Sequence, residues 1–394
     1  LFIASCLHSK KWVSINSRLS KDDIITQLKQ IPIKSYISKA DRKLEGYRFV
    51  DIAADYSMHD LKYIIDCEKD CLLVFTSGSG GNPKAVVHSL KGLILSAKAT
   101  NKFYSLSKDD CWLLSLGLFH IAGVMIFIRM LIINAKIELL DRSLQEKIEE
   151  KKSNIMSLVP TQVSRLIEAE VDLSHLKLII IGGAKTESWL INRLKDLSVP
   201  ASLSYGSSET CAQISATKIL DFDGSCGEIL DSRELKVSED SCLMIKGEAI
   251  FSGYYSNKKF INPKIDQYFI SSDIAEIKDN KLYIKGRSDR VFQFGGENIS
   301  PEIIEKELLK NLNYDLQVVP KKDKEYGNVV CLVIRSINKP DINKVRESFK
   351  NLSSLLTPKE VYWHPSDSIN SKISINYYIR RVSGFDMLDP LEKL

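Results

Sequence analysis

Short apolar runs, each followed by a turn and a helix-like segment, recur between Cys71 and Thr210 and constrain the fold more than any other feature. Runs that are apolar throughout are typical of strands in a parallel sheet, because helices cover both faces of such a sheet. The segments between them support this interpretation, since Leu190, Leu194 and Leu197 fall on one helical face. The clearest strand candidates are residues 155–159, 178–181 and 201–204.

Small and polar residues follow the carboxyl ends of these runs, where ligands collect in a parallel sheet. We therefore expect five short motifs to meet along one edge of a sheet and to form a site. The motifs are the glycine-rich loop after residues 71–74, His120, Pro160-Thr161, Gly182-Gly183 and Tyr205-Gly206.

After Leu220 the sequence changes to short segments of alternating apolar and polar residues, which predict strands. Asp279-Asn280 indicates a tight hairpin between residues 275–278 and 281–284. The predicted fold class is α/β. A large N-terminal region, 1–288, is expected to contain parallel sheets flanked by helices and a small β subdomain at about 221–288. A small, mobile α+β domain follows at 289–394.

The C-terminal domain is predicted from local signals. Ser300 is a favoured N-cap residue, and Pro301 suits the first position of a helix. A strand at 328–335, a helix at 342–355 and a strand at 361–363 complete a small lid. The only lysine-rich stretch, at 321–324, is interrupted by Asp323 and is interpreted as a solvated loop, so we expect no nucleic-acid partner.

Composition describes a globular chain with 44% hydrophobic and 27% charged residues and a net charge of +5. The eight cysteines show no CxxC pair, which fits a reducing cytoplasm. No histidine and cysteine spacing suits a structural metal. The longest apolar stretch, residues 112–128, is broken by His120 and Gly123, so a strand, a turn and an amphipathic helix are expected in place of membrane insertion.

The glycine-rich loop, FTSGSGGNPKAVVHS at residues 75–89, favours a nucleoside triphosphate. Backbone N–H groups after a strand can converge on phosphate oxygens, while hydroxyls and Lys84 add donors and charge. It is not a Walker loop, because Lys84 follows Pro83 and precedes Ala85. An ordinary Gly/Ser surface turn is the alternative. The hydroxyl donors are Thr76, Ser77 and Ser79.

Four more motifs follow in order: YGSSE at 205–209, Asp273, GRSDR at 286–290 and Lys372 near the end. Together with the loop they closely resemble the adenylate-forming superfamily of acyl-CoA synthetases. Within it the chain is most similar to the o-succinylbenzoate CoA ligases of menaquinone synthesis. The segments that carry this similarity are SLVPTQ at 157–162, GGENISPEIIEKEL at 295–308, VVPKKDKEYG at 318–327 and KIS at 372–374.

The resemblance covers the whole chain, with departures at Gly80, Ser272, Ser371 and Ile375, where the family usually has Thr, Gly, Gly and Arg. The family fold starts several dozen residues earlier, so we expect a segment to precede Leu1. The resemblance implies an acid–thiol ligase in which a carboxylate attacks ATP to give an acyl-adenylate, and CoA then displaces AMP. It implies Mg²⁺, ATP, CoA and a small carboxylic acid as ligands; a homo-oligomer is left open.

The same resemblance assigns roles to single residues. Lys372 should bridge the carboxylate and the α-phosphate, Glu209 should carry Mg²⁺, and His120 should line the acyl pocket or gate ATP. The expected ligands of the phosphates are Thr76, Ser77, Gly78, Ser79 and Lys84. The expected contacts of adenine and ribose are Gly183, Tyr205, Gly206, Ser208, Asp273 and Arg287.

Several assignments keep alternatives. Asp289 is the implied hinge of a swinging lid that brings residues 295–296 across, or else a linker carboxylate or salt-bridge partner. The second carboxylate of o-succinylbenzoate needs a partner in a partly apolar pocket. The candidates are His120, Arg129, Ser157 and Thr161.

His120 could instead be a satisfied core histidine, Arg129 could extend to the surface, and Lys372 could be a surface lysine. Rival functions are a ligase for another aryl or fatty acid, a non-catalytic nucleotide-binding remnant, and a nucleotide-sensing regulator.

Overall fold

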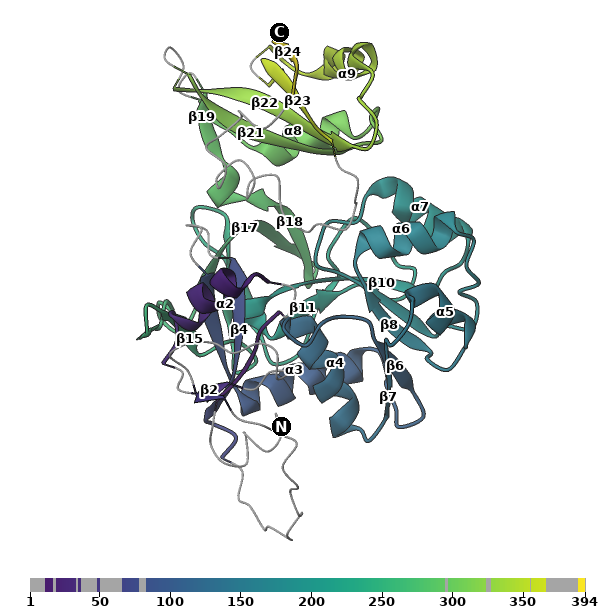
Figure 1. Ribbon diagram of the computed structural model, residues 1–394, viewed down its shortest axis with the longest axis vertical. Coiled ribbons are helices and arrows are strands. Elements are labelled where there is room, and N and C mark those ends of the chain that lie inside the picture. The colour runs from purple at the N-terminus through teal and green to yellow at the C-terminus, as the bar shows by residue number, and fades with distance from the viewer. Residues whose placement is uncertain are drawn as a thin grey trace. The chain divides into compact units, whose positions relative to one another are not determined.

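The computed structural model describes residues 11–16, 19–32, 35–36, 48–49, 66–77, 83–294, 297–323, 327–354, 356–365 and 389–393 (Figure 1). The chain divides into two compact units. The first comprises residues 1–238, 243–271 and 276–283, and the second comprises 239–242, 272–275 and 284–394.

The centre of the first unit is a parallel sheet in the order β7 (Lys136–Leu139), β6 (Cys111–Leu114), β8 (Ile155–Leu158), β9 (Leu178–Ile181) and β10 (Ala201–Ser207). Successive side chains of a strand point to opposite faces. In β9, Ile179 and Ile181 enter one apolar cluster, whereas Leu178 and Ile180 enter another. Burial on both faces explains why this run contains no polar residue, and the three predicted strands are confirmed.

Helices cover both faces of the parallel strands, as predicted: α5 (Leu144–Glu149), α6 (Pro160–Glu168) and α7 (Ser188–Asp196) on one face, and α3 (Leu90–Phe103) and α4 (Ile121–Ile132) on the other. Figure 1 shows α6 and α7 side by side. Val163, Leu190 and Leu194 are buried in the first cluster, and Ile126 is buried in the second. Leu197 was wrongly included in the buried face, because it caps the end of α7 and is 46% exposed.

Antiparallel strands extend this sheet beyond β10 in the order β11 (Ala212–Ala216), β12 (Glu228–Ile229), β18 (Lys281–Arg287), β17 (Phe269–Lys278), β14 (Cys242–Lys246) and β13 (Glu234–Val237). The predicted hairpin joins β17 and β18, and Asp279 and Asn280 have φ angles of 51° and 59°. Both residues thus occupy the left-handed region that a tight two-residue turn requires. The β-rich character expected after Leu220 is present, but these strands continue the sheet and do not form one of their own.

A second sheet in the first unit has the order β1 (Trp12–Ser14), β4 (Asp70–Ser77), β5 (Pro83–Ser89), β15 (Gly253–Ser256) and β16 (Lys259–Ile261). Helix α2 (Lys21–Leu28) packs Ile24 and Leu28 on one face of it. The expectation that the glycine-rich loop follows a strand of the parallel sheet is wrong, because β4 pairs antiparallel with β5. A buried apolar run fits either kind of pairing, and a glycine-rich connection suits a hairpin as well as a crossover. A parallel pair, β2 (Ser35–Tyr36) and β3 (Arg48–Phe49), stands apart.

Among its described residues, the second unit contains a hairpin, a four-stranded sheet and two α-helices. Ile304, Leu308, Val345 and Val361 belong to its apolar core. The elements are β19 (Phe292–Phe294), β20 (Glu297–Ile299), α8 (Pro301–Leu308), β21 (Asp315–Asp323), β22 (Gly327–Ser336), α9 (Ile342–Ser348), η3 (Phe349–Asn351), β23 (Glu360–Pro365) and β24 (Asp389–Lys393).

The predicted α+β character of this unit is confirmed, and so is the start of α8 after Ser300. Two details were wrong. Lys321 and Lys322 lie in β21 and not in a solvated loop, since Lys321 Nζ pairs with Glu360 at 2.7 Å and contacts the Tyr362 hydroxyl at 2.6 Å. The second helix ends at Ser348 and tightens into η3, because Phe349 turns into the core.

None of the helices in the described part of the chain is long and apolar enough to span a membrane. The described cysteines carry no disulfide; they are Cys67, Cys71, Cys111, Cys211, Cys226, Cys242 and Cys331.

Candidate active site

The parallel pairing of three strands in the first unit stops at the same level. Leu158 of β8, Ile181 of β9 and Leu203 of β10 are paired in register. Gly183 and Tyr205 each lie two residues beyond this level, after Ile181 of β9 and Leu203 of β10. The predicted pair therefore occupies one edge of the sheet. Gly183 has a φ of +79°, which only glycine adopts freely. This edge therefore presents a glycine surface beside a half-buried tyrosine.

The turn after Tyr205 places Glu209. The pairing of β10 with β11 is interrupted between Tyr205 and Gly206, and a Cβ on Gly206 would lie 1.6 Å from the carbonyl oxygen of Ala212. No other residue fits there without moving the backbone. The following 3-10 turn, η1 (Ser208–Thr210), carries the predicted Ser208 and Glu209, both half-buried.

Hydrogen bonds hold η1 in place from both sides. The Thr210 hydroxyl accepts from the Ser207 N–H at 2.8 Å and donates to the Ala212 carbonyl at 2.9 Å. The Phe251 N–H donates to the Glu209 carbonyl at 2.7 Å. The backbone that carries the Glu209 carboxylate is therefore tied to two other segments of the first unit.

Tyr254 connects Glu209 to the glycine-rich loop region, and no sequence motif predicted this role. The Tyr254 hydroxyl donates to Glu209 Oε1 at 3.0 Å. Lys84 Nζ lies 5.1 Å from the centroid of the Tyr254 ring, within cation–π range. Burial raises the pKa of Tyr254, and the Glu209 charge raises it further, so its hydroxyl stays protonated.

The described part of the glycine-rich segment is a hairpin. Thr76 pairs with Lys84 and Ser77 pairs with Pro83 at the end of the hairpin where the chain connects β4 to β5. Thr76 and Lys84 are half-buried. The predicted phosphate ligands Gly78 and Ser79 lie outside the described residues, as does Lys372.

A buried thiol lies two residues after Glu209. Cys211 Sγ is 3.3 Å from His88 Nδ1, and both side chains are fully buried. Burial raises the pKa of Cys211 to about 12 and lowers the pKa of His88 to about 3. The pair is therefore neutral at pH 7 and offers no thiolate nucleophile.

Asp273, Arg287 and Asp289 meet in the second unit. Arg287 Nη1 donates to Asp273 Oδ1 at 3.2 Å. Its Nε and Nη2 donate to the two carboxylate oxygens of Asp289 at 2.8 and 2.7 Å, in a forked pair. This hydrogen bonding by Arg287 lowers the pKa of Asp289. The salt-bridge interpretation of Asp289 is thus realised, and the hinge interpretation stays a prediction.

His120 was expected at the end of a strand, which is wrong, because β6 ends at Leu114. The residues between them form turns, and His120 is the N-cap position of α4 without a side-chain cap. It is exposed and its ring lies 4.6 Å from the Phe119 ring, so the satisfied core histidine is also excluded.

Arg129 is buried, with 3% of its surface exposed, so the expectation that it extends to the surface is wrong. Its guanidinium carbon lies 5.5 Å from the Trp112 ring centroid. Nε and Nη2 have no hydrogen-bond partner among the described residues. Burial lowers the pKa of Arg129 to about 10, which leaves the group charged at pH 7.

The other acyl candidates differ in exposure. Ser157 is 7% exposed within β8, and its carbonyl accepts a 2.5 Å hydrogen bond from the Ser115 hydroxyl. Thr161 is exposed on the first turn of α6.

Glu209 is the carboxylate that could hold a divalent cation. The described residues contain no group of three or more His, Cys, Asp or Glu side chains with metal-binding geometry. Mg²⁺ does not need such a group, because it is usually held by one or two carboxylates, water and substrate phosphates. One oxygen of Glu209 is engaged by Tyr254 and the second is left for a ligand, so the donor set fits Mg²⁺ bound together with a triphosphate.

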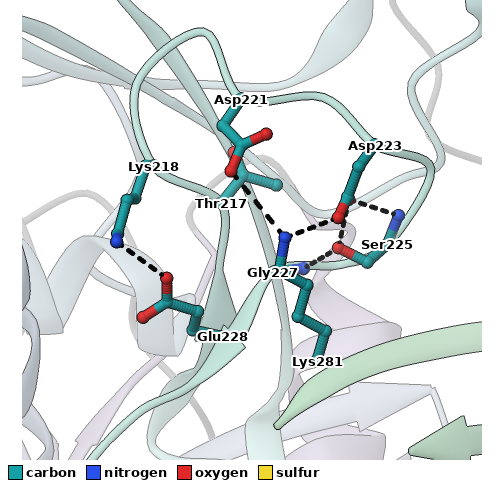
Figure 2. Close-up of a pocket in the computed structure, with 8 residues that line it drawn as sticks. All are labelled: Thr217, Lys218, Asp221, Asp223, Ser225, Gly227, Glu228 and Lys281. Atoms are coloured by element: carbon teal, nitrogen blue, oxygen red, sulfur yellow. Dashed lines mark hydrogen bonds and ion pairs between the residues drawn. The ribbon is translucent and has the colours of Figure 1, made fainter. Parts of the chain in front are cut away.

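A shallow surface pocket in the first unit lies elsewhere, and none of the predicted site residues lines it (Figure 2). Lys281 pairs there with Asp223 at 2.6 Å, and Lys218 pairs with Glu228 at 3.1 Å. Figure 2 shows these charges turned toward one another. Lys281 also lies 3.8 Å from Asp221, so two ammonium groups face three carboxylates and the pocket offers no unpaired ammonium for an anionic ligand.

Comparison with known proteins identifies a family. The profile of the AMP-binding enzyme family matches residues 12–255. A 2-succinylbenzoate–CoA ligase of Staphylococcus epidermidis is 30% identical over 376 residues, which cover 88% of this chain and 78% of that protein.

Two solved structures show the same fold. The o-succinylbenzoate CoA synthetase (MenE) from Bacillus subtilis in complex with the acyl-adenylate intermediate OSB-AMP superposes with a TM-score of 0.81 at 21% identity, covering 93% of this chain and 81% of that one. The same enzyme in complex with ATP and magnesium ion gives a TM-score of 0.80 at 22% identity, covering 92% and 82%.

Proposed function

Because this chain belongs to the AMP-binding enzyme family, we propose that it is an AMP-forming acid–CoA ligase that converts o-succinylbenzoate to o-succinylbenzoyl-CoA in the cytoplasm. The observation that carries the proposal is the meeting of Lys84 and Glu209 around Tyr254, although they are far apart in the sequence. An ammonium and a carboxylate at this spacing suit the two halves of a metal-bound triphosphate. The names of the relatives supply the acid.

The reaction brings an anion toward a polyanion, so it needs positive charge where negative charge grows. Lys84, with hydroxyl and backbone donors at Thr76, Ser77, Gly78 and Ser79, holds the β- and γ-phosphates. Glu209 would hold Mg²⁺, which would neutralise part of the charge of the triphosphate. Lys372 stabilises the attacking carboxylate and the α-phosphate oxygens.

The adenosine end is held by neutral and paired groups. Adenine lies against Gly183 and Tyr205 at the sheet edge, with the turn at Gly206 and Ser208 beside it. In the second unit, Asp273 accepts hydrogen bonds from the ribose hydroxyls. Arg287 donates a hydrogen bond to Asp273 and orients its carboxylate.

The thioester half-reaction needs a different surface over the adenylate, while water is excluded from a reactive anhydride. A backbone rotation at Asp289 withdraws Lys372 and brings residues 295–296 to the thiol of CoA. The forked pair of Asp289 with Arg287 has to move with this rotation or open during it.

Arg129 is the group we assign to the second carboxylate of o-succinylbenzoate. A buried guanidinium with two donor nitrogens unused by the described residues is costly without an anion. Arg233, which is half-buried, lowers the pKa of Arg129 further by adding like charge. This excess of positive charge at and beside the buried Arg129 favours a dianionic acid over the rival fatty-acid substrate, which would need an apolar pocket.

The test is ATP- and Mg²⁺-dependent pyrophosphate release with a panel of acids. We expect the largest signal with o-succinylbenzoate. Lys372→Ala serves as the control, and its rate should fall on the order of 100- to 1,000-fold, because it removes charge stabilisation of the transition state. A larger signal with benzoates or long-chain acids would replace the acid and keep the chemistry. Silence with every acid would favour a nucleotide-binding remnant.

A further inference from the structure

Two charges in the first unit, on Lys84 and Glu209, are left unneutralised by the described residues. Neither forms an ion pair with another described side chain. The neutral side chain of Tyr254 touches both, its ring below the ammonium and its hydroxyl on the carboxylate. A direct Lys84–Glu209 pair would satisfy both charges and remove both from a ligand.

Sheet geometry explains this placement. Tyr254 of β15 pairs with Val86 of β5, and Lys84 lies two residues from Val86 on the same face. Diagonal neighbours of this kind are within reach of aromatic and long side chains. The next residue, Tyr255, points to the opposite face, where its hydroxyl accepts from Lys11 Nζ at 3.2 Å.

The Tyr254 ring is also braced from a third direction. Its centroid lies 4.8 Å from that of Phe251, at an interplanar angle of 59°. The backbone N–H of Phe251 donates to the Glu209 carbonyl. Ring, hydroxyl and carboxylate therefore form one connected unit, and the orientation of the Glu209 carboxylate is determined by a side chain on another sheet.

We propose that Tyr254 is a positioning residue for ATP activation: its hydroxyl holds Glu209 Oε1 so that the other oxygen faces the metal, and its ring keeps Lys84 near that carboxylate without neutralising it. This inference rests on the proposed function. It assigns Tyr254 no contact with the reacting atoms. Its effect is expected on the metal dependence of nucleotide binding more than on the chemical step.

The experiment compares Tyr254→Phe, which removes the hydroxyl, with Tyr254→Leu, which also removes the ring. Tyr255→Phe is the matched control, because it deletes the same group from the adjacent residue on the opposite face. ATP binding is measured by calorimetry with and without Mg²⁺, and pyrophosphate release is measured over a range of Mg²⁺ concentrations. Thermal unfolding of each variant confirms that it is folded.

For Tyr254→Phe we expect Mg²⁺-dependent ATP binding to weaken about 10-fold, since a hydrogen bond to a charged group is lost, while binding without Mg²⁺ is unchanged. The apparent KM for Mg²⁺ should rise with little change in kcat at saturating metal. Tyr254→Leu should weaken binding without Mg²⁺ as well. Tyr255→Phe should behave as the unmodified protein.

Equal Mg²⁺ dependence in Tyr254→Phe and the unmodified protein would overturn the inference, as would an equal loss in Tyr255→Phe. Failure of the proposed function looks different. If the unmodified protein binds ATP and Mg²⁺ but releases no pyrophosphate with any acid, the ligase assignment is wrong, and the calorimetric comparison still decides the role of Tyr254.

Discussion

Arg129 in α4 and Arg287 at the end of β18 stand in opposite electrostatic surroundings. Arg129 is 3% exposed, and two of its nitrogens have no partner among the described residues. Arg287 is 46% exposed at its side chain and pairs with two carboxylates. Solvent would stabilise Arg287 even without partners, whereas Arg129 has none of that help. The protein pairs Arg287 with its own carboxylates, and the lack of such a partner for Arg129 among the described residues is the basis of our proposal that Arg129 binds the acid.

The largest effect is expected for Arg129→Met. The rate of pyrophosphate release with o-succinylbenzoate should fall roughly 100-fold, because the second carboxylate loses a charged partner worth about 3 kcal/mol. The free energy of unfolding should stay level or rise, since replacing an uncompensated buried charge by an apolar side chain of similar size is often stabilising.

The control for this variant is an aryl acid of the same shape without the second carboxylate. The rate of pyrophosphate release with this acid should be nearly the same for the unmodified protein and for Arg129→Met. An equal fall with both acids would show that Arg129 serves the fold or the nucleotide, and it would remove the contrast with Arg287.

Arg287→Met should have a smaller effect of a different kind. We expect the KM for ATP to rise about 10-fold, because Asp273 and Asp289 lose the cation that orders them. The free energy of unfolding should change by less than about 1 kcal/mol, as for other exposed ion pairs. Lys285→Met removes the same charge from the same strand and should leave the KM unchanged; a shared rise would indicate a general field effect.

The smallest effect concerns the pH dependence of stability. Arg287 lowers the pKa of Asp289 in the folded protein. A group with a lowered folded pKa stabilises the protein above its unfolded pKa and loses that contribution as the pH falls through the folded value.

Asp289→Asn should therefore lower the free energy of unfolding slightly at pH 7, and the difference should shrink below about pH 4, the ordinary range of an aspartate. Urea unfolding at several pH values measures it. A difference that is constant with pH would mean that the fork contributes no ionic stabilisation.

Much of the first unit could be predicted because its signals are local. Apolar runs such as residues 178–181 must be buried on both faces, and Asp279-Asn280 accepts the positive φ of a tight turn. The same reasoning misassigned the strand before the glycine-rich loop, because an apolar run does not say which sheet it joins. It also placed Lys321 in a loop, because its partners on β23 are distant in sequence.

The site residues also divide into those that local motifs predict and those whose role depends on contacts between distant segments. Residue type and the order of the motifs were enough to predict four site residues: Lys84, Glu209, Asp273 and Arg287. Tyr254 carried no such signal, because its importance comes from the register of β15 with β5 and from a hydrogen bond to another sheet. The sequence around Gly253 and Tyr255 could have indicated a strand, but it could not have indicated which residues the side chains of that strand contact.

The sequence alone was enough to predict the α/β class, the family resemblance and most of the polar groups needed to bind a metal-bound triphosphate. Only the tertiary structure decided which charges are satisfied: Arg287 by two carboxylates, Arg129 by none of the described ones, and Lys84 and Glu209 kept apart by a phenol ring. The physical reason is that charge, type and order are properties of single residues, whereas burial and pairing depend on which distant segments fold against one another.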